Sequence, residues 1–162
     1  VADVTGSTVT RVDDFLVLAI SGHTAIGIAG DRSERRGFSA VDLESTKAWP
    51  IADGITVAWD AWTMPDGRFV VYGNAATGTG VAIMTVGPGQ DAGHGRLVTT
   101  LDGDSRFIVG WWIGSDHLLL APNRGGFDDT IASADALDLL DLGTGDIIPA
   151  AVPVQGMPAN TP

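Results

Sequence analysis

The stretch Trp62–Gly73, W-T-M-P-D-G-R-F-V-V-Y-G, has an aromatic residue, a tight turn and then an apolar run. The same order returns in Trp112–Pro122, W-I-G-S-D-H-L-L-L-A-P, where Asp116 takes the place of Asp66. The chain therefore contains an internal repeat. The length and content of that repeat decide the fold, so the surrounding sequence is best compared with it first.

Short stretches rich in Val, Ile, Leu and Phe alternate with the 22 glycines and 8 prolines of the chain. Sustained 3.6-residue periodicity is almost absent, and this pattern is typical of all-β proteins. We expect three groups of four strands, over residues 15–20, 25–29, 38–43, 48–51, 55–59, 68–73, 81–86, 96–101, 107–112, 118–121, 137–142 and 147–152.

The turn in each group gives the period of the repeat. Gly22, Asp66 and Asp116 align, at spacings of 44 and 50 residues. A repeat of about 40 to 50 residues with four short antiparallel strands is typical of a β-propeller blade. Asp-Gly between two strands accepts positive φ at low cost, which suits a twisted hairpin. We therefore place Asp66-Gly67 and Asp116-His117 at hairpin turns.

Three pieces of the second group, W-T-M-P-D-G-R-F-V-V-Y, V-A-I-M-T-V and G-R-L-V-T, resemble one repeat of the TolB-type, WD-repeat-like β-propeller family. In that pattern a Trp-Ser-Pro-Asp-Gly-Lys turn opens the second strand, and an Arg-Leu-Thr sequence ends the blade. The third group follows the pattern in part. The first group has Leu18 where the tryptophan is expected, and it lacks the Pro-Asp pair. The resemblance implies four-stranded blades, about three of them plus part of another, in an incomplete propeller.

The expected organisation follows from this repeat. V-T-G-S-T-V-T-R-V near the start aligns with G-T-G-D-I-I-P-A-A near the end, so the first residues are interpreted as the end of a preceding blade. The proline-spaced end of the chain is interpreted as a flexible tail or linker. The segments are 1–12 (end of a preceding blade), 13–53, 54–104 and 105–152 (blades), and 153–162 (tail).

The net charge is −11, from 20 acidic and 9 basic residues, and the acids are scattered along the chain. This charge repels phosphate backbones and argues against a nucleic-acid partner. Two explanations of the excess of acidic residues stay open: they keep the protein soluble, or they attract a basic or cationic partner. No apolar run reaches the roughly 20 residues of a membrane span. The family resemblance favours an extracytoplasmic location, whether secreted, periplasmic or cell-surface.

Motifs for catalysis, metals and cofactors are incomplete. Cysteine is absent. His23, His94 and His117 have no partner at metal-ligand spacing. Asp102–Ser105, D-G-D-S, begins like a calcium loop, but Ile113 stands where that loop needs glutamate. The glycine-rich stretches lack a helix start and a Walker lysine. We expect no catalytic residue, no metal and no cofactor in this chain.

Candidate binding residues come from two places. Trp59 and Trp111 lie near Trp62 and Trp112 along their strands, and alternation makes at least one tryptophan of each pair face outward. We expect Trp62 and Trp112 to pack between neighbouring blades. The longest insertion, 123–135, is where we expect a partner to bind. The candidate residues are Trp59, Trp111, Asn123, Arg124, Phe127, Asp128 and Asp129.

The predicted function is a non-catalytic protein-interaction or ligand-binding propeller module, because a propeller fold by itself specifies no activity. We expect its partner to be another protein or further blades, supplied by the same chain, by a second chain or by a homodimer. The alternative is the propeller domain of a hydrolase, such as a peptidase related to prolyl oligopeptidase. Its catalytic residues would then lie outside these 162 residues.

Overall fold

The computed structural model describes the backbone over residues 14–30, 37–51, 54–78, 80–87, 95–101, 106–122 and 136–153. Side chains are described over the same residues except 106–112, 122, 150, 152 and 153. The predicted segment 1–12 and the insertion 123–135 lie outside these ranges.

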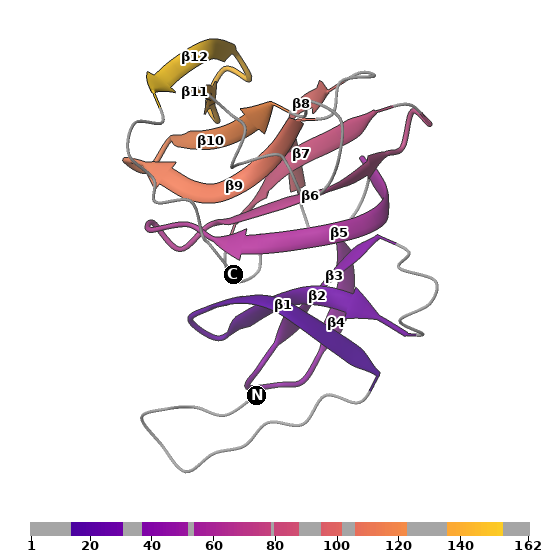
Figure 1. Ribbon diagram of the computed structural model, residues 1–162. Helices are drawn as coiled ribbons and strands as arrows, with labels where there is room; N and C mark the ends of the chain where they lie inside the picture. Colours follow the sequence, from indigo (N-terminus) through magenta and orange to yellow (C-terminus); the bar gives the residue numbers. More distant parts are fainter. Residues whose placement is uncertain are drawn as a thin grey trace, which may run out of the picture. The chain divides into compact units, whose positions relative to one another are not determined.

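Twelve strands and no helix are present in the described ranges, which confirms the all-β prediction (Figure 1). Each predicted strand corresponds to one observed strand. The largest difference is at β5, which continues beyond Trp59 to Thr63, and Pro153 belongs to β12 instead of the tail. The strands are β1 (Phe15–Ser21), β2 (Thr24–Ala29), β3 (Phe38–Asp42), β4 (Ala48–Ile51), β5 (Ile55–Thr63), β6 (Phe69–Ala75), β7 (Val81–Val86), β8 (Gly95–Leu101), β9 (Arg106–Ile113), β10 (His117–Pro122), β11 (Ala136–Asp141) and β12 (Ile147–Pro153).

The strands form three four-stranded antiparallel sheets, and each sheet uses four strands that are consecutive in the chain. The first sheet contains β1 to β4, the second β5 to β8 and the third β9 to β12. Neighbours in each sheet follow one another directly, so every sheet is a meander. The chain divides into two compact units, Val1–Thr100 with the first two sheets and Leu101–Pro162 with the third.

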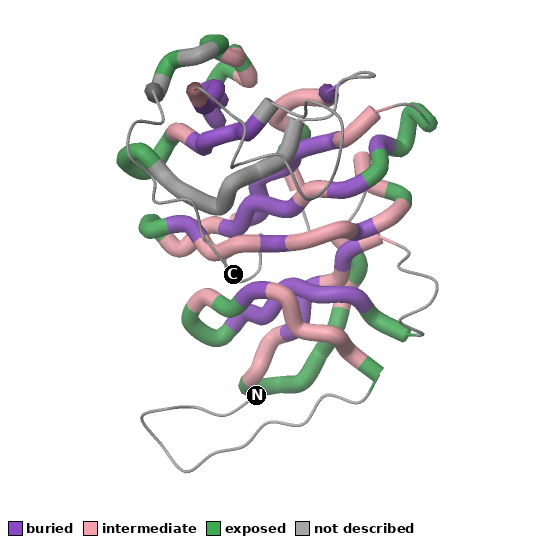
Figure 2. Tube along the Cα trace, viewed as in Figure 1, coloured by how far each residue is buried: buried purple, intermediate pink, exposed green. Residues whose placement is uncertain are grey.

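In the first unit, the first and second sheets pack face to face around one apolar core. Thr63 Oγ1 also donates a 2.7 Å hydrogen bond to the carbonyl oxygen of Ile20, which joins the ends of β5 and β1. Figure 2 shows the buried positions concentrated along β2, β6 and β7. The buried members of the core are Ala19, Ile26, Ile28, Phe38, Ala40, Ala58, Ala61, Phe69, Val71, Met84 and Val86.

The third sheet is apolar on both faces. Leu119, Ala121 and Leu137 form a core cluster on one face. Leu118 and Leu140 pair across β10 and β11 and are fully buried on the other face. Burial of alternate residues on both sides explains why β10 is a continuous apolar run in the sequence instead of an alternating one.

Glycines with positive φ form the first hairpin turn of each sheet, at Gly22, Gly67 and Gly114. Gly67 has φ of 87°, and its N–H donates to the Met64 carbonyl oxygen at 2.9 Å. Asp66 accepts the Arg68 N–H at 3.0 Å. The predicted Asp66-Gly67 turn is therefore confirmed. In the third sheet Asp116 lies in the turn, and the following residue is already the first of β10.

The first strand of each sheet carries a β-bulge or irregularity near its middle. In the first sheet the register shifts between Val17 and Ala19, and in the second between Ala58 and Asp60. The β9–β10 register shifts in the same part of the third sheet. Such a bulge adds residues to one strand and bends it toward its partner.

A glycine of the second strand accommodates this approach in the first two sheets. A methyl group at Gly27 would overlap the Leu16 carbonyl oxygen, and a methyl group at Gly73 would overlap the Val57 carbonyl oxygen. Both glycines lie inside strands without positive φ. They are therefore required by the closeness of the backbones and not by a turn.

Replacing Gly73 by alanine is expected to lower the free energy of unfolding by more than about 2 kcal/mol, because the methyl group forces β5 and β6 apart. Asn74→Ala, at the next and exposed position of β6, is the matched control and should change stability by less than about 0.5 kcal/mol. Chemical denaturation measures both variants. Equal stabilities of Gly73→Ala and wild type would contradict the close approach.

The hairpin between β3 and β4 in the first sheet and the hairpin between β11 and β12 in the third sheet share one conformation. Asp42 Oδ1 accepts the Glu44 and Ser45 N–H groups at 3.0 and 2.7 Å. Asp141 Oδ1 likewise accepts the N–H groups two and three residues later, at 2.6 and 2.9 Å. Four residues after each aspartate the backbone has positive φ, 57° at Thr46 and 83° in the second hairpin.

The residue in this left-handed position differs between the hairpins. It is Gly145 in the third sheet, whereas the first sheet has the β-branched Thr46. A β-branched residue is strained in this conformation, and glycine is not.

We expect Thr46→Gly to raise the free energy of unfolding by about 0.5–1 kcal/mol, because relief of strain exceeds the added chain entropy of glycine. The reverse change, Gly145→Thr, should destabilise by about 1–2 kcal/mol. Denaturation of the two single variants tests the pair. A loss of stability in Thr46→Gly would contradict this, because it would show that the interactions of Thr46 stabilise the fold by more than its backbone strain destabilises it.

Candidate functional site

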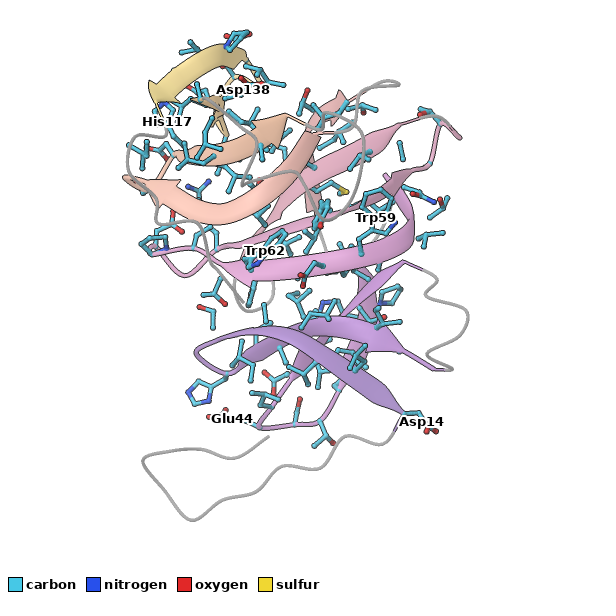
Figure 3. The ribbon with its side chains drawn as sticks, viewed as in Figure 1. Asp14, Glu44, Trp59, Trp62, His117 and Asp138 are labelled. Carbon is cyan, nitrogen blue, oxygen red and sulfur yellow. The ribbon has the colours of Figure 1, made fainter. Side chains whose placement is uncertain are left out.

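Three aromatic side chains gather on one face of the second sheet. The ring centroids of Trp62 and Tyr72 lie 5.0 Å apart with an interplanar angle of 18°, so these rings stack. Trp59 meets Tyr72 edge to face, at 5.5 Å and 82°. Both tryptophans lie along β5 (Figure 3), and all three side chains are partly buried. We call these three residues the aromatic cluster.

The bulge in β5 explains how both tryptophans contact Tyr72. In a regular strand Trp59 and Trp62, three positions apart, would point to opposite faces. The bulge falls at Trp59 and changes this alternation. Ala58 and Ala61 accordingly both belong to the core on the other face, although they too are three positions apart. Trp59 and Trp62 therefore lie on the same side of β5, opposite the core alanines, instead of on alternate sides.

Asp60 lies directly opposite Tyr72 in the β5–β6 register and completes the group. Its Oδ1 accepts the Ala61 N–H at 2.8 Å. Among the side chains that the structure describes, no cationic group forms an ion pair with Asp60. Burial raises the pKa of the Tyr72 phenol, and the negative charge of Asp60 raises this pKa further.

The chemistry of this arrangement favours a cation. The faces of Trp and Tyr rings carry negative electrostatic potential and attract ammonium or guanidinium groups. A half-buried carboxylate beside them attracts the same groups and has lone pairs beyond the one used by Ala61. The aromatic cluster and Asp60 together are the candidate site.

His23 and His117 lie elsewhere, in the hairpins of the first and third sheets. His23 Nδ1 is 3.2 Å from Glu44 Oε1, and these side chains are 74% and 70% exposed. His117 Nε2 is 3.6 Å from Asp141 Oδ2. The first pair is exposed, and such pairs contribute little to stability. They are features of the hairpins, and among the described side chains neither pair has a third group that would make a catalytic arrangement.

The alignment of Gly22 with Asp116 in the sequence also matches His23 with His117, and the strand register corrects this match. Thr24 pairs with Asp42 in the first sheet, and His117 pairs with Asp141 in the third. His117 therefore corresponds to Thr24 and not to His23. The repeat does not place the two histidines at equivalent positions.

Carboxylates with lowered pKa values occupy the same hairpins. The Ser45 N–H lowers the pKa of Asp42, and the Thr144 N–H lowers the pKa of Asp141. These hydrogen bonds shape the turns and account for the shifts. The described ranges contain no group of three or more His, Asp or Glu side chains arranged to hold a metal ion.

Asp138 is a buried carboxylate that the sequence analysis did not single out. It is 5% exposed in the middle of β11, opposite Leu120, and it interacts with another residue. Alternation with Leu140 in A-L-D-L-L-D was a usable signal, because it places this aspartate on an apolar face.

The remaining predicted residues are not tested by the described part of the chain. Trp111 lies in β9, but its side chain is outside the description. The other predicted binding residues, and also His94 and the segment 102–105, lie outside the described residues. These binding residues are Asn123, Arg124, Phe127, Asp128 and Asp129.

Within the described ranges, no helix is long and apolar enough to cross a membrane. The predicted extracytoplasmic location stays a prediction.

Comparison with known proteins identifies a fold and no family. No protein-family model matches the chain, and no curated protein sequence matches it. Among solved structures, it is similar to an oligogalacturonate lyase in complex with manganese, at a TM-score of 0.51 and 11% sequence identity. The match covers 81% of this chain and 33% of that protein, which is a β-propeller. The chain thus spans about a third of the length of its structural neighbour, and the likeness concerns the fold alone.

Tyr72 is the only tyrosine in the sequence, so phenolate absorbance reports its ionisation alone. We expect a midpoint above the ordinary value of 10.0, and a lower midpoint in Asp60→Asn because a neighbouring negative charge is removed. Since the folded pKa is raised, stability should fall as pH rises from 10 through the folded pKa. A midpoint at or below 10, or an unchanged midpoint in Asp60→Asn, would contradict this geometry.

Proposed function

We propose that this chain is part of a β-propeller and serves as a non-catalytic interaction module for a basic protein partner. In this proposal each four-stranded meander is one blade. The four-stranded topology, the repeated bulge in the first strand and the similarity to a propeller structure support the fold.

The proposed organisation keeps residues 13–53, 54–104 and 105–152 as blades. Further blades or a protein partner complete the propeller. Coverage of 33% of the similar structure supports this proposal, because that propeller is about three times the length of the matched part. The apolar character of both faces of the third sheet supports it as well, because an apolar sheet face is stable only when another element packs on it.

The observation that carries the binding role is the aromatic cluster with Asp60 beside it. Tryptophan and tyrosine are enriched where proteins bind one another, because they supply large and rigid contact areas. All three aromatic residues here are partly buried and retain some exposure. The chain carries a net charge of −11, so long-range attraction would bring a basic partner to it.

The alternative is the propeller domain of an enzyme, with catalytic residues outside this chain. The similar structure is that of a lyase, which is the observation in favour of this alternative. A polyanionic substrate such as oligogalacturonate would be repelled by the negative charge of this chain. The proposal therefore prefers a basic protein as partner.

Calorimetric titration with nona-arginine and nona-lysine peptides tests the binding role, with nona-glutamate as the control. We expect both basic peptides to bind, with an affinity that falls as salt is raised, because charge attraction is screened. Nona-glutamate should not bind. Absence of binding by both basic peptides at low salt would overturn the proposed preference for a basic partner.

A further inference from the structure

We propose that Trp59, Asp60 and Trp62 bind the guanidinium group of an arginine side chain presented by a protein partner. This inference rests on the proposed function and names the group that the basic partner inserts. It goes beyond overall charge, because it assigns recognition to one strand of one sheet.

The bulge brings the three residues together on one side of the sheet. Trp59 and Trp62 both contact Tyr72, and Asp60 pairs with Tyr72 across the two strands. Ala58 and Ala61 occupy the core side of the same strand. A cation that reaches Asp60 therefore lies beside indole rings and not beside the apolar core.

The rings differ in orientation, and this favours a planar cation. Trp62 is nearly parallel to Tyr72 and covers one of its faces, whereas Trp59 is nearly perpendicular to it. Both indoles contact Tyr72, the residue that lies opposite Asp60 in the register. A planar guanidinium can stack on an indole face while its N–H groups point along its own plane to a carboxylate.

Asp60 can still accept hydrogen bonds in this arrangement. Its Oδ1 accepts one from Ala61, and the remaining lone pairs suit the fork of donors on a guanidinium. A lysine ammonium is more strongly hydrated and does not stack in the same way. The site is therefore expected to prefer arginine over lysine.

The closing experiment uses three probes with the full chain: acetylated and amidated Gly-Gly-Arg-Gly-Gly, the matching lysine peptide, and free agmatine. Two-dimensional NMR follows the indole N–H signals during titration, and phenolate absorbance follows Tyr72. The arginine peptide should shift the indole signals of Trp59 and Trp62 and bind about 5- to 10-fold more tightly than the lysine peptide. It should also lower the Tyr72 midpoint, because a bound cation offsets the charge of Asp60.

Variants separate this site from general charge attraction. Asp60→Asn should weaken binding of the arginine peptide about tenfold, and Trp59→Ala about fivefold. Trp59→Phe keeps an aromatic ring and should retain most of the affinity. This variant replaces Trp59→Ala in the test if the alanine variant does not fold. Glu44→Gln removes the same charge in the turn between β3 and β4 of the first sheet, outside the aromatic cluster, and should leave the affinity unchanged.

Each outcome bears on the inference. Equal binding of the arginine and lysine peptides would overturn the inference, and so would equal weakening of binding by Asp60→Asn and Glu44→Gln. In either case, binding of nona-arginine would leave the proposed function standing. If agmatine binds as tightly as the arginine peptide, the claim that a protein partner supplies the guanidinium group would be overturned. If neither nona-arginine nor nona-lysine binds, the proposed function fails first, and the inference fails with it.

Discussion

The contact between the β5 backbone and Gly73 is the constraint on which the rest of the second sheet depends. The carbonyl oxygen of Val57 occupies the space that a side chain at position 73 would need. This allows the bulge at Trp59, and the bulge moves the following residues to new faces. Small alanines then fill the core side of β5, while Trp59, Asp60 and Trp62 meet Tyr72 on the other side. One close approach of two backbones thus determines both the core and the candidate site.

The same arrangement recurs in the first sheet with different side chains. Gly27 lies under the carbonyl oxygen of Leu16, next to a bulge at Leu18, where the second sheet has Trp59. Leu18 packs against the core of the first unit. The backbone device is therefore shared, and the aromatic cluster belongs to the second sheet. This difference favours a specific role for the cluster over a general requirement of the fold.

The hairpin ends show how the sheets have diverged at one equivalent position. In each sheet, the first residue of the second strand pairs with the last residue of the third strand. This pair is Thr24 and Asp42 in the first sheet, and His117 and Asp141 in the third sheet. In the second sheet the same position is occupied by the apolar residues Phe69 and Val86, both in the core. Polar side chains occupy this position in the first and third sheets, with Thr24 buried and the other three partly buried, whereas the second sheet has an apolar pair in the core. Sequence alignment alone, which matched the two histidines, could not find this relation because turn lengths differ.

Much of the fold could be predicted, because apolar runs and Asp-Gly turns are local signals. All twelve strands and the Asp66-Gly67 turn are examples. The site was predicted only in part, as Trp59, since a bulge has no marker in A-W-D-A-W and depends on the partner strand. Gly73 inside an apolar run was the available signal. The predicted residues of the insertion 123–135 lie outside the described structure.

The central claim is that the bulge places both tryptophans of β5 against Tyr72. Nuclear Overhauser contacts between the Tyr72 ring protons and the two indoles measure this most directly, because such contacts require protons close in space. The account predicts contacts from Tyr72 to both Trp59 and Trp62, whose ring centroids lie 5.5 and 5.0 Å away. Contacts to Trp62 alone, with Trp59 close to Ala58 and Ala61 on the core side, would show a regular strand and contradict the account.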